Sequence, residues 1–170
     1  MIRLRALEPE DVEFLMECES DPESGRWSDY RAPFSRQQLL TYILTYDADP
    51  ISAGQIRLIA ENDGMPVGII DFYEISERDS RAYVGITIHP LYRGMRLARP
   101  ALESAAQYAF NSLGLAQIDA RVSTQNTKGL TLFREAGYKE SAILLKWIKI
   151  GNRWHDIIIF QKFFCNFVID

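Results

Sequence analysis

The feature that most constrains the fold is a basic loop, residues 89–98 (HPLYRGMRLA), which lies between a strand-like segment and a long helix with apolar residues at helical spacing. The first N–H groups of a helix have no intrahelical acceptor, and the helix dipole adds a partial positive charge there. A strand that turns through such a loop into a helix is therefore suited to bind an anion. Three arginines add to this charge: Arg93, Arg96 and Arg99. The loop alone predicts either a phosphate site or an ordinary connection with solvated arginines.

Helices and strands are mixed along the chain, and short polar turns link its middle strands. The predicted strands are residues 3–5, 55–61, 67–75, 82–88, 118–122, 144–150 and 154–163, with turns at 62–64, 76–80 and 151–152. The predicted helices begin at Pro9, after the Ser35 capping box, after the basic loop and after residue 126, and their ends are marked by Asp21-Pro22, Gly114 and Gly137. We therefore predict an α+β fold with a mixed, mostly antiparallel central sheet flanked by about four helices.

The bulk properties are those of one ordinary domain, residues 1–170, with 47% hydrophobic and 25% charged residues. No apolar run approaches the roughly 20 residues that span a bilayer, and no signal peptide is visible, so we expect a cytoplasmic protein with no membrane partner. The two cysteines, Cys18 and Cys165, have neither disulfide nor zinc spacing, and we expect no metal. The net charge of −4 disfavours nucleic acid as a partner and mildly favours cationic substrates.

A second motif, residues 126–138 (NTKGLTLFREAGY), opens the helix that follows the predicted strand at 118–122. Together with the basic loop and the opening residues 2–11 (IRLRALEPED), this motif resembles the GNAT superfamily of acetyl-CoA-dependent N-acetyltransferases. The closer likeness is to the branch that holds the spermidine acetyltransferases and the ribosomal-protein N-terminal acetyltransferases, and it runs from Arg3 to about Phe163. The resemblance implies the GNAT fold, acetyl-CoA as the acetyl donor, and direct transfer of the acetyl group to a primary amine.

The resemblance also implies where the cofactor binds. The loop of the family has the pattern Arg/Gln-x-x-Gly-x-Gly/Ala, which this chain matches with Arg93 at the first position and Ala98 at the last. Arg96 replaces the middle glycine, so its side chain either swings outward and adds a charge-assisted contact or narrows the phosphate cradle. The expected pyrophosphate ligands are the side chain of Arg93 and groups of the loop that follows: Gly94, Met95, Arg96, Leu97 and Ala98.

Further cofactor contacts are expected beside the loop. By position in the family, the backbone around Ile86 and Ile88 pairs with the pantetheine arm and directs an N–H at the thioester carbonyl, where a preorganised donor stabilises developing negative charge. Gly85 in the same strand permits a bulge or a close approach of the ligand. Asn126 is expected to hold the cofactor across the gap between two strands, although an asparagine before a helix also suits an N-cap.

The acceptor amine is protonated at neutral pH, so the reaction requires a group that accepts a proton, directly or through water. Candidates on the middle strands are Glu74, Tyr83 and Asp71. Glu74 aligns best with an acidic position of the polyamine-acetylating branch, so Glu74 and Tyr83 are the expected catalytic residues, with Asp71 as the alternative. His89 has a suitable ring, but it opens the phosphate loop, away from the expected entrance of the amine.

Many members of the family have a tyrosine where this chain has Phe133, and that tyrosine is thought to protonate the departing thiolate. A thiol pKa of about 8.5 makes the thiolate a tolerable leaving group, so the loss lowers the rate without forbidding the reaction. Phe133 remains an expected cofactor contact, and Tyr138 and Tyr108 are candidate substitutes for the acid. Together with Arg96, this departure motivates an alternative function, a CoA-binding sensor or interaction module with little turnover.

The acceptor is expected to be a polyamine-like small molecule, with a protein N-terminus or lysine as the alternative. Aromatic rings near the first helices suit an alkyl amine or a peptide terminus: Trp27, Tyr30, Tyr42 and Tyr46. Acidic residues in the same region and on the closing strand could hold a polyamine: Glu17, Glu19, Asp21, Glu23 and Asp156. The apolar tail, residues 163–169, indicates a covered surface and leaves a homodimer open.

Overall fold

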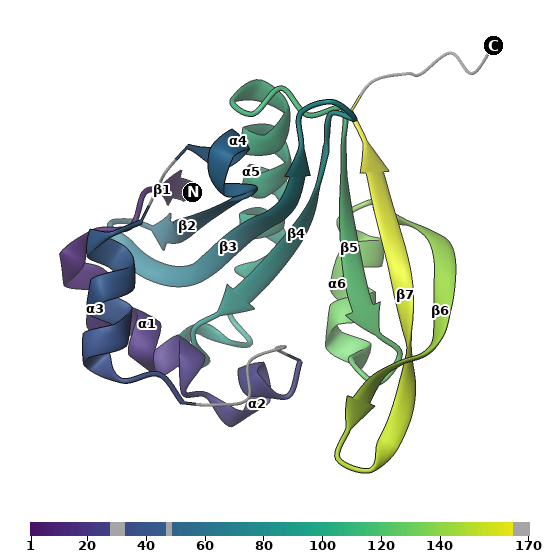
Figure 1. Ribbon diagram of the computed structural model, residues 1–170, viewed down its shortest axis with the longest axis horizontal. Coiled ribbons are helices and arrows are strands. Elements are labelled where there is room, and N and C mark those ends of the chain that lie inside the picture. Colours follow the sequence, from purple (N-terminus) through teal and green to yellow (C-terminus); the bar gives the residue numbers. More distant parts are fainter. Residues whose placement is uncertain (28–32, 47–48, 165–170) are drawn as a thin grey trace.

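The computed structural model describes residues 1–27, 33–46 and 49–164, and in this part of the chain seven strands form one sheet with helices on both faces (Figure 1). The strands are β1 (Ile2–Arg5), β2 (Gln55–Asn62), β3 (Met65–Ser76), β4 (Arg81–Ile88), β5 (Gln117–Ser123), β6 (Lys139–Ile150) and β7 (Arg153–Phe163). The helices are α1 (Val12–Glu19), α2 (Pro22–Gly25), α3 (Arg36–Leu44), α4 (Pro50–Ala53), α5 (Ala98–Asn111) and α6 (Thr127–Glu135), with short 3-10 turns at Pro9–Asp11 and Pro90–Tyr92.

The strand order is β1-β2-β3-β4-β5-β7-β6, and every neighbouring pair is antiparallel except β4 with β5. This arrangement confirms the predicted α+β fold with a mixed, mostly antiparallel sheet. Four of the described helices have eight or more residues, as the sequence indicates, and α2 and α4 add four residues each. Helix α2 was not predicted, because Asp21-Pro22 indicates the end of a helix. The Asp21 carboxylate accepts a hydrogen bond from the Ser24 N–H and so also begins a new helix.

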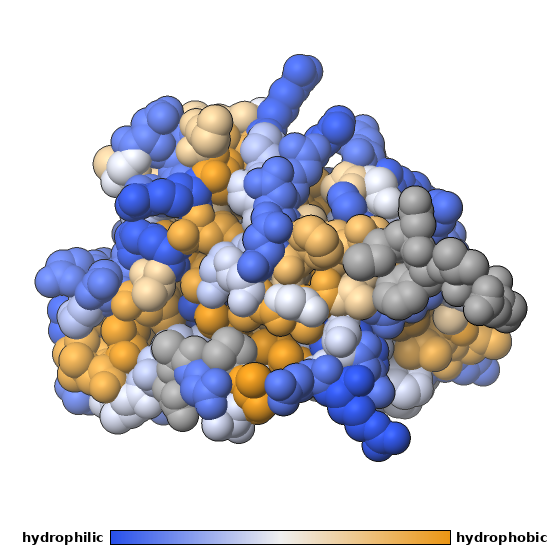
Figure 2. All heavy atoms as spheres, turned by 90° about the horizontal axis from the view of Figure 1, so that it is seen from above, coloured by the Kyte–Doolittle hydropathy of each residue, from blue (hydrophilic) through white to orange (hydrophobic). Residues whose placement is uncertain are grey.

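Two apolar layers hold the helices against the sheet. On one face, small residues of α5 allow the helix to approach β3, β4 and β5 closely; the fully buried ones are Ala101, Ala105 and Ala109. On the other face, α1 and α3 pack over Ile59 and Ile69. Seen from above, apolar side chains reach the surface between charged ones rather than as one uninterrupted apolar face (Figure 2).

Strand β6 starts at Lys139, five residues before the predicted start at residue 144. The early residues already pair with β7, with Lys139 opposite Gln161 and Ile143 opposite Ile158. Because β6 is the edge strand of the sheet, its side chains are mostly exposed, and the alternation of buried and exposed residues that identifies a strand in a sequence is lost.

The sheet is split between β4 and β5. The two parallel strands pair only where Arg81, Ala82 and Tyr83 meet Gln117, Ile118 and Asp119, and beyond these residues they diverge (Figure 1). Strands β1 to β4 therefore form one arm, and β5, β7 and β6 form a second arm with α6. Residues 84–88 of β4 have no strand partner on the side that faces β5. The ligand-binding part of the molecule is built around this split.

Candidate active site

The basic loop joins the end of β4 to the first turn of α5, beside the split. Two of its residues, Gly94 at φ +80° and Arg96 at φ +58°, have left-handed backbone conformations. Arg96 thus keeps the conformation that a glycine at this position adopts without strain, at a cost of about 1 kcal/mol for a residue with a side chain. The loop keeps a glycine-like backbone, and the Arg96 side chain does not prevent it.

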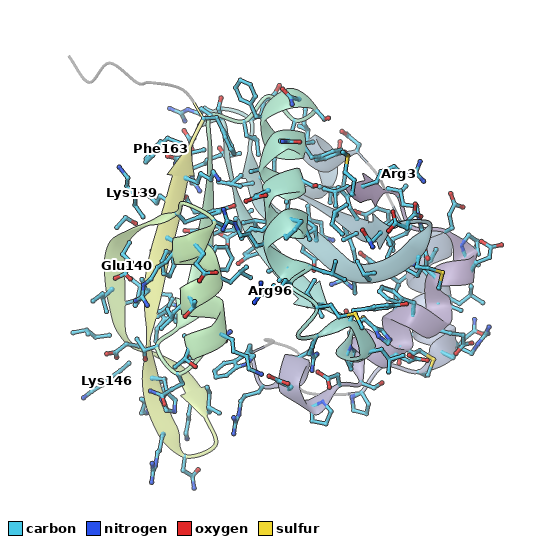
Figure 3. The ribbon with its side chains drawn as sticks, turned by 180° about the vertical axis from the view of Figure 1, so that it is seen from behind. Arg3, Arg96, Lys139, Glu140, Lys146 and Phe163 are labelled. Carbon is cyan, nitrogen blue, oxygen red and sulfur yellow. The ribbon has the colours of Figure 1, made fainter. Side chains whose placement is uncertain are left out.

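A cleft of about 1080 Å³ lies between the start of α5 and α6, and Figure 3 shows Arg96 where the two arms diverge. The cleft is lined by Arg96, Ala98, Arg99, Pro100, Glu103, Thr127, Lys128, Thr131, Leu132 and Glu135. Three of these side chains are cations, and two of the three are paired: Arg99 with Glu103 at 2.9 Å and Lys128 with Glu23 at 2.8 Å. The N-terminus of α5 and these cations make the cleft suitable for phosphate groups.

Arg93, the expected phosphate ligand, folds away from this cleft onto α2. Its Nη2 donates to Asp21 at 2.5 Å and to Ser24 Oγ at 2.9 Å, and its Nη1 donates to Glu23 at 3.1 Å. Its Nε donates to the carbonyl oxygen of Ile88 at 3.1 Å. Arg93 also lowers the pKa of the Asp21 carboxyl to about 2 through their hydrogen bond. All three guanidinium nitrogens are thus engaged within the protein.

The free edge of β4 has backbone groups that point into the split. The N–H of His89 donates to the carbonyl oxygen of Val67 on β3 at 3.0 Å. In an antiparallel pair, residues whose backbone groups face the partner alternate with residues whose groups face away. The N–H and C=O groups of Ile86 and Ile88 therefore face β5, across the split. The role of this edge in binding the cofactor stays a prediction, and its orientation suits that role.

Asn126 is the N-cap of α6, and its Oδ1 accepts a hydrogen bond from the N–H of Gly129 at 2.9 Å. This confirms the N-cap interpretation. A Cβ atom on residue 129 would lie 2.7 Å from Nδ2 of Asn126, so Gly129 leaves room for the asparagine side chain. Because the cap uses only the oxygen, the Nδ2 amide remains able to donate to a ligand.

Glu74 lies in a β-bulge on β3, where residues 74 and 75 stand opposite Ala82 alone and Glu74 has φ +49°. Both of its carboxylate oxygens accept hydrogen bonds from Arg121 of β5, at 2.7 and 2.9 Å. The Arg121 guanidinium carbon lies 3.8 Å from the centre of the Tyr83 ring, which stacks on Tyr73 at 5.5 Å. The two expected catalytic residues are therefore brought together, and a third residue, Arg121, links them across the split.

Arg121 is not among the residues predicted for the site. Its only signal in the sequence is the alternation of β5, in which Asp119, Arg121 and Ser123 share one face and apolar residues share the other.

Asp71, the alternative base, is engaged in a different ion pair. Its carboxylate accepts hydrogen bonds from Nε and Nη2 of Arg57 at 2.6 and 3.1 Å, and Glu19 accepts one from Nη1 at 2.8 Å. The Tyr42 ring lies 5.7 Å from the Arg57 guanidinium, and the Tyr46 hydroxyl accepts a hydrogen bond from the backbone N–H of Arg57. Burial raises the pKa of Tyr42 to about 12.

The expected aromatic group is divided. Tyr42 and Tyr46 contact each other edge to face at 5.4 Å, whereas Trp27 lines a second cleft of about 460 Å³ between α2 and the start of α6. Tyr30 lies outside the described residues. Asp156 accepts a hydrogen bond from the N–H of Lys146 at 2.7 Å and so fixes the β6–β7 hairpin.

His89 is a buried structural residue. Its Nε2 lies 2.7 Å from Glu17 Oε2, and its Nδ1 accepts from the N–H of Leu91 at 3.3 Å, which assigns the ring proton to Nε2. The ring also stacks on Phe14 at 5.0 Å. These contacts tie α1 to the start of the basic loop.

Phe133 is 5% exposed and lies in the core on the α6 side of the sheet, edge to face with Tyr138 at 5.0 Å and stacked on Phe160 at 5.8 Å. The buried hydroxyl of Tyr138 has no hydrogen-bond partner among the described residues, and burial raises its pKa. Burial also raises the pKa of Tyr108 on α5. A phenol whose pKa is raised is a weaker acid, so neither tyrosine is a good donor to a thiolate.

Within residues 1–27, 33–46 and 49–164, no helix is long and apolar enough to cross a membrane. The same residues contain no cluster of three or more histidine, cysteine, aspartate or glutamate side chains arranged to hold a metal ion.

A split mixed sheet with a glycine-containing loop and a helix N-terminus beside the split defines the class of acyl-CoA-dependent transferases. The sequence model of the acetyltransferase (GNAT) domain family matches residues 2–139, and the chain belongs to this family. The expected recognition and fold are thereby confirmed. The protein is an N-acetyltransferase, and acetyl-CoA is its acetyl donor.

Relatives and solved structures agree with this assignment. The chain is 27% identical over 163 residues to a spermidine N(1)-acetyltransferase of Escherichia coli, a match covering 94% of this chain and 86% of the relative. It is 23% identical to a putative ribosomal N-acetyltransferase of Bacillus subtilis, over 94% of this chain and 90% of that one. The structure of the Vibrio cholerae spermidine N-acetyltransferase in complex with CoA and spermine superposes with a TM-score of 0.84 at 24% identity, over 95% of both chains.

Proposed function

We propose that the acceptor of the acetyl group is the primary amine of a small, polyamine-like cation. The observation that carries this proposal is the environment of Arg121: a cation already lies against the Glu74 carboxylate and over the Tyr83 ring. An ammonium group is bound by the same two partners, a carboxylate and an aromatic face. The names of the Escherichia coli relative and of the Vibrio cholerae structure, both spermidine acetyltransferases, support the same acceptor class.

Charge favours a cationic acceptor at longer range as well. The ion cluster of Arg57 holds two carboxylates, Asp71 and Glu19, against one guanidinium, so it has a net negative charge. The chain as a whole has a net charge of −4. Both features raise the local concentration of polycations more than they stabilise the bound state.

The phosphates of acetyl-CoA are proposed to bind at the basic loop and the N-terminus of α5, and the pantetheine arm along the free edge of β4. The N–H groups of Ile86 and Ile88 and the C=O group of Ile86 supply the hydrogen bonds on this edge, whereas the carbonyl oxygen of Ile88 already accepts one from Arg93. Nδ2 of Asn126, left free by the cap, is the proposed donor from the second arm. The cofactor is thus proposed to accept hydrogen bonds from both sides of the split.

Glu74 is the proposed proton acceptor, directly or through water, and Tyr83 contributes the ring beside it. Each carboxylate oxygen of Glu74 receives one hydrogen bond from Arg121, so each keeps a lone pair for the amine or a water molecule. Side-chain exposure of 53% leaves Glu74 accessible to an acceptor.

The test is release of free thiol from acetyl-CoA, followed with spermidine and with an N-terminal peptide as acceptors. Turnover at least about tenfold faster with spermidine supports the proposal. Faster turnover with the peptide would transfer the activity to a protein N-terminus, as the name of the Bacillus subtilis relative suggests for that protein.

One observation favours a second candidate, a CoA-binding module with little turnover: position 133 has no phenol, and burial raises the pKa of the two candidate substitutes, Tyr138 and Tyr108. Phe133→Tyr separates the candidates. If thiolate departure limits a true acetyltransferase, the added hydroxyl raises kcat by up to about tenfold with little change in cofactor affinity. A non-catalytic CoA binder stays at background turnover. A fall in kcat together with a lower Tm would show that the core around Phe133 does not accept the oxygen.

A further inference from the structure

Two arginines of the basic loop, three positions apart, have opposite surroundings. Arg93, at the position that matches the loop pattern of the family, makes four hydrogen bonds through its guanidinium group, three of them to α2. Its side chain is 27% exposed and its partner Asp21 is 13% exposed. Withdrawing Arg93 toward a phosphate would leave a largely buried carboxylate without its partner, which is costly.

Arg96, at the position of the missing glycine, is exposed and has no hydrogen-bond or ion-pair partner among the described residues. The other two cations that line the same cleft, Arg99 and Lys128, each have a glutamate partner. Arg96 is therefore the one cleft-lining cation, within the described part of the chain, whose charge is not already matched by a carboxylate.

The backbone of Arg96 adds a second, independent observation. Its φ of +58° is a conformation that a side chain strains, so the residue lowers the stability of the fold relative to glycine. Strained conformations of this kind cluster at ligand-binding sites and in tight turns, and Arg96 lines a cleft. The same conformation lets the loop keep its backbone N–H groups available while the side chain extends into the cleft.

We propose that Arg96, rather than Arg93, is the side-chain ligand of the cofactor phosphates, and that Arg93 is a positioning residue that holds α2 against the end of β4. This division of roles rests on the proposed binding of acetyl-CoA at the loop. It assigns a function to Arg96, which replaces the middle glycine of the family pattern. Because the charge of Arg93 is paired with carboxylates at α2, Arg96 supplies the positive charge at the phosphate site instead.

The first experiment uses Arg96→Gly and measures CoA binding by calorimetry together with Tm. The two quantities are expected to move in opposite directions. Affinity falls about tenfold because a charge-assisted contact is lost, and Tm rises by about 2–4 °C because the strain is relieved. The loss of affinity is smaller at high salt, where the contact is already screened.

The matched control is Ser80→Gly, which relieves the same kind of strain (φ +48°) in the β3–β4 turn. It is expected to raise Tm without changing CoA affinity. Unchanged CoA affinity in Arg96→Gly would overturn the proposal, and so would a lower Tm, because the side chain would then be packed rather than strained. If wild-type protein itself fails to bind CoA, the proposed binding site is wrong, which is a different result.

Dephospho-CoA identifies the phosphate that Arg96 contacts. If the contact is to the 3′-phosphate, Arg96→Gly lowers the affinity for CoA but not for dephospho-CoA. If it is to the pyrophosphate, both affinities fall by a similar factor. Either result supports the assignment of Arg96 as a phosphate ligand.

Arg93→Gln and Arg93→Lys test the positioning role. Loss of the guanidinium in Arg93→Gln lowers Tm and raises the KM for the amine more than the KM for acetyl-CoA. The reason is that α2 and Trp27, an aromatic residue expected near the acceptor, line the second cleft rather than the phosphate cleft. Arg93→Lys partly restores Tm and the KM for the amine, since a lysine ammonium can pair with Asp21 but cannot make all the hydrogen bonds of the planar guanidinium group. A large loss of CoA affinity in Arg93→Gln at unchanged Tm would overturn the proposal.

Discussion

Strand β3 presents one carboxylate to an arginine of the neighbouring strand β2 and another to an arginine of β5, two strands away, and the two ion pairs differ in their surroundings. Asp71 and Arg57 face each other in regular strand pairing, Glu19 from α1 adds a second carboxylate, and Tyr42 and Tyr46 cover the group. Glu74 instead lies on a bulge, with 53% of its side chain exposed, and reaches Arg121 on the other arm of the sheet. The first ion pair is enclosed by the protein, and the second is open to a ligand.

This difference separates a structural ion pair from a functional one of the same chemistry. In the enclosed pair the guanidinium of Arg57 is already shared by two carboxylates, and each of these charges offsets the partial burial of the others. The open pair leaves carboxylate lone pairs and an aromatic ring accessible. A bidentate arginine–carboxylate contact is therefore not by itself evidence of either role, and exposure and backbone conformation decide between them.

The largest effect on stability is expected when the ion pair of Arg57 with Asp71 is broken. Arg57→Ala leaves Asp71 and Glu19 without their cation, and the free energy of unfolding should fall by about 3 kcal/mol, the low end for breaking a buried pair because these groups are partly exposed. Urea denaturation measures this loss. An unchanged urea midpoint would mean that the ion pair of Arg57 with Asp71 contributes no more to stability than the pair of Arg121 with Glu74.

Glu74→Gln tests the open pair. If Glu74 accepts the amine proton, kcat falls by roughly 100-fold and the pH profile changes, while CoA affinity stays nearly constant. Tm should change little, because the amide can still accept a hydrogen bond from Arg121. The control Glu61→Gln alters a carboxylate of β2 that pairs with Arg3 and Arg5, far from the split, and should leave kcat unchanged. Wild-type turnover in Glu74→Gln would move the role to Tyr83, Asp71 or water.

The ion pair of Asp21 with Arg93 is expected to give the smallest effect on stability. The pKa of Asp21 is lowered to about 2, chiefly by the hydrogen bond from Arg93. A lowered carboxyl pKa contributes stability that is complete above the unfolded pKa near 4 and is lost as the pH falls toward 2. Asp21→Asn should therefore cost about 2 kcal/mol or less at pH 7, and the difference from wild type should shrink between pH 4 and pH 2 in acid-unfolding curves. A difference independent of pH would contradict this.

Local signals in the sequence predicted most of the fold. The Ser35 capping box begins α3 with both of its reciprocal hydrogen bonds, and the turn at residues 62–64 joins β2 and β3. The basic loop and the Asn126 motif each precede a helix, as predicted. These features depend on residues within one turn of each other, which is the range over which a sequence specifies structure directly.

The charge partners of the site could not be predicted in this way. Arg93 contacts Asp21, 72 positions earlier, and Arg121 contacts Glu74, 47 positions earlier. Such pairs depend on how distant segments of the chain pack together. The bulge that turns Glu74 toward Arg121 contains no glycine, so the sequence has no residue that indicates it. The family resemblance implied a phosphate contact for Arg93, but it could not reveal that Asp21, Glu23 and Ser24 engage its guanidinium group.

The short parallel ladder between β4 and β5 also affects how the backbone amides exchange with solvent. Amides in the middle of a sheet normally exchange slowly, because a neighbouring strand must separate first. The N–H groups of Ile86 and Ile88 point away from β3 and have no strand beside them, so they should exchange with deuterium almost as fast as loop amides although they lie in the centre of the sheet. A ligand that occupies the split would act as the missing strand and protect these two amides.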